Sequence, residues 1–376
     1  MPDSNDTIRN PELFGVGPDE AMVTFVTDDS AAVTTKVGDV EVTTTGPYHV
    51  ARLTGLEPAT TYPLAVDGVD HDEYFPAELT TLARPPGRLR ATIATANDVH
   101  FGETECGRLG NALEEELGPV FHSDPGEPPY PETMNRAAVV EMAALDPDAV
   151  VVKGDLTNVG TEDEYAAFLD VYGTLGDRMR HVRGNHDAMT DPTIAADDAP
   201  FTIELDGVTL AVLDTVIPGL ERGQVTHHQQ AWLDELARQT AGPILLFGHH
   251  HLWNLDADDR SDSYFGINPD DSEALAGIVA QHENIVGYFA GHTHRNRVRR
   301  FAEAREIPFC EIACTKDYPG AWAEYRVYDG GYTQVVRRTA APDAMAWTEK
   351  TRAMFAGLYR DYALGPLEHR CFSERF

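Results

Sequence analysis

The sequence predicts an α/β fold preceded by a small all-β domain, and two patterns of residues support this. From Leu89 onward, short apolar runs alternate with helix-like stretches, which is typical of a sheet whose strands are buried on both faces. Before that point, short segments rich in Val and Thr are separated by Gly, Asp and Pro. We therefore expect a β-sandwich over residues 1–84, an α/β domain over 85–340, and a C-terminal helix and tail over 341–376 that packs on the α/β domain or at an oligomer interface.

The N-terminal segments "AMVTFVTD", "VEVTTT" and "YHVARL" are expected to be antiparallel strands. In "LTGLEPATTYPLAV", a Leu and a Pro turn come before Tyr62, which opens a strand. This order resembles the tyrosine corner of fibronectin-type and immunoglobulin-like sandwiches. Tyr62 is therefore expected to be a packing residue, and "ARPPGR" at 83–88 a stiff linker.

In the α/β domain, helices are expected near residues 132–145, 162–175, 226–239 and 271–281. Apolar runs between them end in polar clusters, as in "DAVVVKGD", "RMRHVRGNHD", "GPILLFGHHH" and "NIVGYFAGHTH". Beyond these runs lie β-like segments such as "AEYRVYDG" and "GYTQVVRR". An amphipathic helix is expected over 342–362, because Met345, Met354, Leu358 and Tyr362 recur at roughly helical spacing.

Charge and hydropathy exclude several classes of function. The 376 residues include 29 basic and 62 acidic side chains, a net charge of −33. A surface this negative repels nucleic-acid backbones and anionic lipid, so we expect neither nucleic acid nor membrane as a partner. No apolar run approaches the roughly 20 residues of a membrane span. Because "MPDSNDTIRN" lacks the basic and apolar segments of a secretory signal, we expect a cytoplasmic protein.

The polar clusters that follow the apolar runs contain metal-binding residue types. Ligands in open α/β sheets lie beyond the carboxyl ends of the strands, so residues far apart in sequence are expected to meet there. Imidazole nitrogens with carboxylate and amide oxygens suit Fe, Mn, Zn or Co, and a bridging carboxylate holds two cations close together. Asp155 is the natural bridge. The candidate ligands at five strand ends are Asp98 and His100, Asp155, Asn185 and His186, His249 to His251, and His292 and His294.

This constellation resembles the calcineurin-like metallophosphoesterase superfamily, whose signature is D-x-H, G-D, G-N-H-D/E, a later H and G-H-x-H. The resemblance covers about residues 90–300 and implies a two-sheet α/β sandwich with two divalent or trivalent metal ions. It implies one ion bound by Asp98, His100, Asp155 and His294. It implies a second ion bound by Asp155, Asn185, His249 and His292. His186 would contact the phosphate or protonate the leaving oxygen.

The subfamily motifs favour a phosphodiesterase. "GDLTN", "QQAWLDELA" and "CTKDYPGAW" are similar to the class III cyclic-nucleotide and glycerophosphodiester phosphodiesterases. Asn158 stands where protein Ser/Thr phosphatases have an Asp and purple acid phosphatases a Tyr iron ligand, which counts against both. The N-terminal sandwich is nevertheless similar to the one in purple acid phosphatases.

The resemblance implies hydrolysis of a small phosphodiester by a metal-bridging hydroxide, with Asp155, Asn185 and His186 as the catalytic residues. The main alternative is a phosphomonoesterase acting on a small organic phosphate. A non-catalytic metal-stabilised scaffold is a remote alternative, because every expected ligand position is filled.

Two segments are expected to form the walls of the substrate pocket. The first is the long stretch 101–131, although its Glu103, Glu105 and Glu114–Glu116 are more simply explained as a solvated acidic loop. The second follows the three histidines and carries Trp253 and Tyr264. The expected substrate contacts are Asn185, His186, His250, Trp253, Tyr264 and Arg295.

Neighbouring side chains of an extended segment point to opposite sides, so the three histidines cannot all bind one ion. Since the family pattern places its ligand directly after the strand, we expect His249 to be the ligand, with His250 as the fallback and His251 a loop residue.

Overall fold

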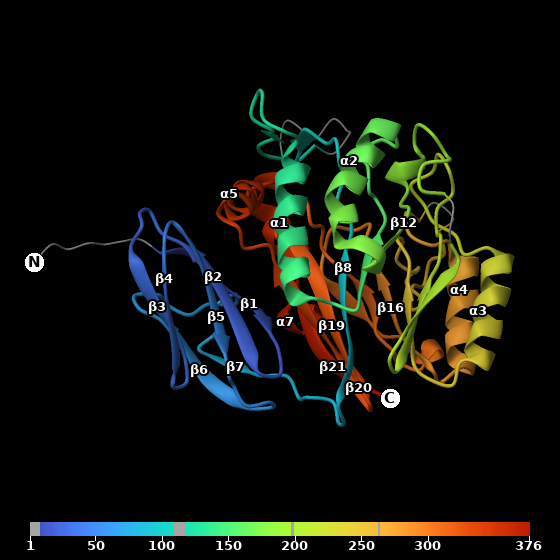
Figure 1. Ribbon diagram of the computed structural model, residues 1–376, viewed down its shortest axis with the longest axis horizontal. Coiled ribbons are helices and arrows are strands. Elements are labelled where there is room, and N and C mark those ends of the chain that lie inside the picture. Colours follow the sequence, from blue (N-terminus) through green and yellow to red (C-terminus); the bar gives the residue numbers. More distant parts are fainter. Residues whose placement is uncertain (1–7, 109–116, 197–198, 262–263) are drawn as a thin grey trace, which may run out of the picture.

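The computed structural model describes residues 8–108, 117–196, 199–261 and 264–376. Two six-stranded sheets pack face to face at its centre, with α1 (Tyr130–Leu145) and α2 (Glu162–Tyr172) on one outer face and α3 (His227–Gln239) and α4 (Pro269–Gln281) on the other (Figure 1). This is the mixed α/β architecture that the alternating pattern predicts.

The first sheet has the order β12-β11-β8-β19-β20-β21. Its strands are β8 (Leu89–Ala96), β11 (Ala149–Lys153), β12 (Met179–Val182), β19 (Ala321–Tyr328), β20 (Gly331–Arg338) and β21 (Cys371–Arg375). β8, β11 and β12 run parallel, whereas β19, β20 and β21 are joined antiparallel. The C-terminal tail therefore completes this sheet as its edge strand.

The second sheet has the order β13-β14-β15-β16-β18-β17. Its strands are β13 (Phe201–Leu205), β14 (Val208–Val212), β15 (Ile244–Phe247), β16 (Ile285–Ala290), β17 (Arg297–Arg299) and β18 (Phe309–Glu311). β14, β15, β16 and β18 are parallel, so their carboxyl ends lie at one edge. The core between the sheets includes Tyr325 of the first sheet, whose ring centroid lies 4.7 Å from that of Phe289 in the second.

The four predicted helices of the α/β domain are confirmed to within a few residues, and capping side chains mark the starts of α2, α3 and α4. Thr161 and Glu164 form a reciprocal capping box at the start of α2, and Asn268 caps α4 just before Pro269. A short hairpin of β9 (Glu105–Cys106) and β10 (Phe121–His122) precedes α1.

The prediction of one continuous helix over 342–362 is wrong. The segment divides into α5 (Pro342–Thr351), a 3₁₀ turn (Phe355–Gly357) and α6 (Leu358–Leu364). Phe355 and Ala356 take positive φ angles of 53° and 56°, which no right-handed helix allows. The short α7 (Leu367–Arg370) then leads into β21.

The N-terminal region forms two smaller sheets with a core of their own. One sheet contains β1 (Arg9–Val16), β2 (Glu20–Val26) and β5 (Tyr48–Thr54). The other contains β3 (Ala32–Val37), β4 (Val40–Thr45), β6 (Thr61–Val66) and β7 (Glu78–Thr80). The hydroxyl of Tyr62 accepts a hydrogen bond of 2.9 Å from the backbone N–H of Glu57, the contact that a tyrosine corner makes.

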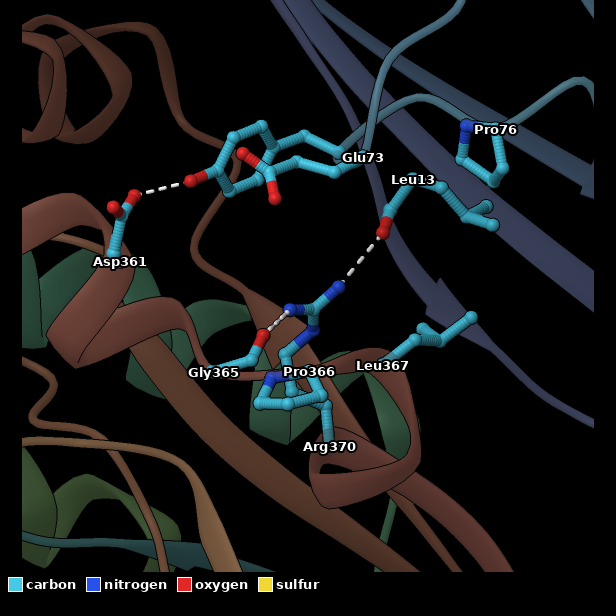
Figure 2. A pocket seen from close by; sticks show the side chains of 9 residues that line it. Leu13, Glu73, Pro76, Asp361, Gly365, Pro366, Leu367 and Arg370 are labelled. Atoms are coloured by element: carbon cyan, nitrogen blue, oxygen red, sulfur yellow. Dashed lines mark hydrogen bonds between the residues drawn. The ribbon is translucent and has the colours of Figure 1, made fainter.

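The N-terminal sheets are tied to the C-terminal segment by polar contacts. Arg370 donates to the carbonyl oxygens of Leu13 and Gly365, and Tyr74 donates to Asp361, beside a pocket of about 360 Å³ at this junction (Figure 2). Among the described residues, no helix combines the length and the apolar composition needed to cross a membrane.

Candidate metal centre

The predicted ligands follow directly after five strands. Asp98 comes after β8, Asp155 after β11, Asn185 after β12, His249 after β15 and His292 after β16. The parallel strands of both sheets thus deliver their polar ends to the same edge of the molecule.

The backbone at this edge is strained where the ligands sit. Asp98, His100, Asp155, His292 and His294 all have positive φ angles, between 45° and 68°. Non-glycine residues in this region cost free energy and concentrate at functional sites. A side chain at Gly184 would place its Cβ 2.2 Å from Oδ1 of Asp155, so only glycine permits this approach.

Asp155 faces two groups of residues with its two carboxylate oxygens. Oδ2 lies 3.5 Å from Nε2 of His100, and Oδ1 lies 3.3 Å from Nε2 of His249. The carboxylate is buried, and Oδ1 also accepts the backbone N–H of His186 at 3.0 Å. This is the geometry that a bridge between two cations requires.

The first group consists of Asp98, His100, Asp155 and His294, whose ligand atoms all lie within 4.8 Å of one another. Nε2 of His294 is 3.4 Å from Oδ1 of Asp98. Both ring nitrogens of His100 are buried without a hydrogen-bond partner. A buried imidazole left in this state, beside two carboxylates, fits a metal ligand.

The second group is organised around His249. Its Nδ1–H donates to the carbonyl of Lys153 at 2.9 Å, which leaves Nε2 to face Oδ1 of Asn185 at 3.1 Å and Asp155. The ring centroid of His292 lies 5.1 Å from that of His249. The Nε2–H of His292 donates to the carbonyl of Phe265 at 2.9 Å, which leaves its Nδ1 as the ligand atom. A backbone carbonyl thus fixes the tautomer of each histidine.

His250 also lies within 4.8 Å of His249 and His292 by its nearest ring nitrogen. However, its Nδ1 accepts from the hydroxyl of Thr215 at 2.8 Å, and its Nε2–H donates to the carbonyl of Glu221 at 3.1 Å. Since both nitrogens are engaged, the contacts favour His249 over His250 as the ligand. His251 is buried rather than facing solvent, and neither of its ring nitrogens has a hydrogen-bond partner.

The electrostatics of the centre favour deprotonated Asp155, His100 and His292, but protonated His249. Burial opposes the charge on Asp155, but His249 and His186 outweigh it and hold the pKa of this carboxyl well below its usual range. Burial lowers the pKa of His292 to about 3 and that of His100 well below its usual value. Burial also acts to lower the pKa of His249, but Asp155 raises it to about 9, so a cation bound there would displace a proton.

His186 borders the centre on its open side. Its Nδ1 lies 2.6 Å from the carbonyl of Asn158, and its ring centroid is 4.5 Å from that of His100. His186 is partly exposed, as are His292 and His294. With Nδ1–H donated to Asn158, Nε2 is the ring nitrogen available to a ligand.

Asp187 is an organising residue that the sequence reasoning missed. It is buried, and Oδ1 accepts bonds of 2.7 Å from both the N–H and the hydroxyl of Thr157. Oδ2 accepts the N–H groups of Leu156 and Gly184 at 3.0 and 2.7 Å. Asp187 therefore joins the turn after Asp155 to the turn before Asn185. The acidic residue directly after "GNH" was the available signal.

Three of the predicted substrate contacts, Trp253, Tyr264 and Arg295, interact with other residues of the protein. Trp253 is buried, and Tyr264 packs against it and donates its hydroxyl to the carbonyl of Leu252. Nε of Arg295 lies 2.8 Å from Oε2 of the buried Glu311.

In the predicted acidic wall, Glu103 pairs with Lys316 at 2.6 Å. Glu105 pairs with Arg108 and His122, and Glu114–Glu116 lie outside the described residues.

The sequence of the chain matches known proteins over this region. A sequence model of the calcineurin-like phosphoesterase family matches residues 91–296. The chain therefore belongs to the calcineurin-like phosphoesterase family, as the motifs predict.

Curated relatives carry diesterase names. A glycerophosphodiester phosphodiesterase of Enterobacter lignolyticus is 26% identical over 188 residues, which cover 44% of this chain and 65% of that protein. A cAMP/cGMP dual specificity phosphodiesterase of Mycobacterium tuberculosis is 31% identical over 171 residues, covering 41% and 51%. The chain thus spans less than two thirds of the length of these two relatives. A dimetal phosphatase from Danio rerio has a TM-score of 0.49 at 15% identity, covering 67% of this chain and 97% of that one.

Proposed function

We propose that the protein is a binuclear-metal-dependent phosphodiesterase that hydrolyses a small phosphodiester. The observation that carries this proposal is the buried carboxylate of Asp155, whose two oxygens face two separate groups of potential ligands at 3.5 and 3.3 Å. The diesterase names of the relatives support the same reaction class.

The donor set is nitrogen and oxygen, which accepts Fe, Mn, Zn or Co. Asp98, His100, Asp155 and His294 would hold one ion, and Asp155, Asn185, His249 and His292 the other. When bound, such a metal pair neutralises phosphate charge and lowers the pKa of water to supply a nucleophile.

His186 and Asn185 would act directly on the phosphodiester. Oδ1 of Asn185 faces His249, so its Nδ2–H₂ remains to donate to a phosphate oxygen. Nε2 of His186 would donate a proton to the departing alkoxide, because its Nδ1 is held by the carbonyl of Asn158.

The charges around the centre favour a diester over a monoester. A monoester carries an additional negative charge, which a further cationic side chain would stabilise. In the described part of the chain, Arg295, next to the ligand His294, is already paired with Glu311, and Lys316 is paired with Glu103. A diester, with a single negative charge, needs no further cation.

We also propose that residues 1–84 form a fibronectin-III-like domain, that residues 85–340 form the catalytic domain, and that 341–376 complete it. The hydrogen bond of Tyr62 to Glu57 supports the first assignment. The pairing of β21 with β20 supports the last.

Hydrolysis of bis-p-nitrophenyl phosphate and p-nitrophenyl phosphate, before and after chelation and metal restoration, tests the reaction class. We expect faster turnover of the diester, loss on chelation and recovery with metal. His186→Ala should keep its metal and lose about 10²–10⁴-fold in kcat. His228→Ala on α3, an exposed histidine, is the matched control. Diester hydrolysis that survives chelation would refute the proposal.

A further inference from the structure

Exposed apolar side chains gather at the loops of the metal centre. Each of five such residues either forms a hydrogen bond to one of these loops or neighbours a residue that does. They are Val159, Met189, Leu220, Phe265 and Tyr362, with exposed fractions between 39% and 44%.

Two of these contacts connect directly to the loop with His292 and His294. The carbonyl of Phe265 accepts Nε2–H of His292, and the hydroxyl of Tyr362 donates to the carbonyl of Thr293 at 2.8 Å.

The other three lie beside His186 or His250. The backbone N–H of Met189 donates to the carbonyl of His186 at 3.3 Å. Val159 follows Asn158, which holds Nδ1 of His186, and Leu220 precedes Glu221, which accepts from His250. All five residues therefore lie on or beside the loops that carry the candidate ligands.

Phe265 has the geometry of a stacking platform. Its ring centroid lies 5.4 Å from that of His292, with the rings inclined by 38°. Behind it, the rings of His251 and Tyr264 lie 4.9 and 5.4 Å away. The ring is therefore supported from within, while 43% of the residue remains exposed beside a ligand of the second metal group.

Trp253 and Tyr264, which the sequence suggested as substrate contacts, are packed instead: Tyr264 against Phe265, and Trp253 against Tyr264. Trp253 is only 8% exposed, and the hydroxyl of Tyr264 is bonded to the carbonyl of Leu252. Of the two exposed aromatic residues that the structure describes beside the metal ligands, Phe265 packs its ring against that of the ligand His292, whereas Tyr362 donates its hydroxyl to the carbonyl of Thr293.

We propose that Phe265 stacks on a planar ring of the substrate, so that the preferred diesters carry a nucleoside or aryl group rather than a glycerol group. This inference rests on the proposed function and specifies its substrate class. Stacking on an aromatic side chain tolerates any base, because every base has a π-face. It also requires no cationic side chain, which agrees with the ion pairs already formed by Arg295 and Lys316.

The test compares kcat/KM for adenosine 3′,5′-cyclic monophosphate and glycerophosphoethanolamine. Phe265→Ala should lower the ratio of kcat/KM for the cyclic nucleotide to kcat/KM for glycerophosphoethanolamine about tenfold, and Phe265→Tyr should restore most of this ratio. Val140→Ala, which truncates an even more exposed apolar side chain on α1, should leave the ratio unchanged. Metal content, measured in parallel, should stay at the wild-type level in Phe265→Ala, since the backbone and not the ring of Phe265 holds His292.

Two results would overturn this inference alone. One is an unchanged ratio in Phe265→Ala with full metal content. The other is a wild-type protein that hydrolyses glycerophosphoethanolamine but not the cyclic nucleotide. If the metal-loaded wild type hydrolyses neither diester nor bis-p-nitrophenyl phosphate, the proposed function fails as well.

Discussion

Asp187→Asn replaces one oxygen of a carboxylate that joins the loops of Asp155 and Asn185. The wild-type side chain accepts four hydrogen bonds, two at each oxygen, from Leu156, Thr157 and Gly184. Whichever way the introduced amide is oriented, its NH₂ group takes the place of one oxygen and faces the two N–H or O–H donors that bonded to this oxygen. Two of the four hydrogen bonds are therefore lost. Since each hydrogen bond to a charged group contributes about 1.5–3 kcal/mol, we expect the free energy of unfolding to fall by about 3–6 kcal/mol.

The assay is urea unfolding of the wild type and the variant, both prepared without metal, with metal binding measured separately. Asp191→Asn is the control, because Asp191 is an exposed acidic residue whose oxygen accepts from Thr193 nearby. We expect the control to lose less than about 1 kcal/mol. If Asp187→Asn is no less stable than the control and binds metal as well as the wild type, then Asp187 does not organise the centre.

Further predictions concern the histidine run and the junction of the N-terminal sheets. His249→Ala should lose one of two bound metal ions, whereas His250→Ala should keep both. Equal losses would place His250 among the ligands. Glu12 is buried, and although burial raises its pKa, Arg352 and Arg338 outweigh this and lower it from 4.5 to about 2. Its contribution of about 3 kcal/mol is therefore present above pH 4.5 and lost as the pH falls towards 2. Unfolding curves between pH 6 and pH 3 should show a steeper loss of stability for the wild type than for Glu12→Gln, and parallel curves would contradict this.

The grouping of the candidate ligands could be predicted because each of them is local to a strand end in the sequence. Each ligand directly follows an apolar run, and the carboxyl ends of parallel strands meet at one edge. The divergence of neighbouring side chains excluded three histidine ligands to one ion, and the choice of His249 over His250 came from the family pattern, which places its ligand directly after the strand. The helix starts were also readable from the local sequence, because Thr161 and Asn268 are capping residues.

Features set by distant contacts could not be predicted. Helical spacing continues through Met354 and Leu358, but the helix is interrupted at Ala356. This residue packs closely against Gly118, where a Cβ atom would lie 2.6 Å from the backbone N of Ala356. Distant contacts also decide which of the aromatic residues Trp253, Tyr264 and Phe265 is exposed, so the sequence could not show this. The backbone of Trp253 is held by Ser272 of α4, which keeps this segment packed inward, and Phe265 is left exposed.

The central claim is that Asp155 belongs to both metal groups, and counting bound ions tests it most directly. Metal content per chain would be measured by mass spectrometry after dialysis of the wild type and three variants. We predict two ions for the wild type, one each for His294→Ala and His249→Ala, and none retained by Asp155→Ala. An Asp155→Ala protein that holds as many ions as either histidine variant would contradict the claim.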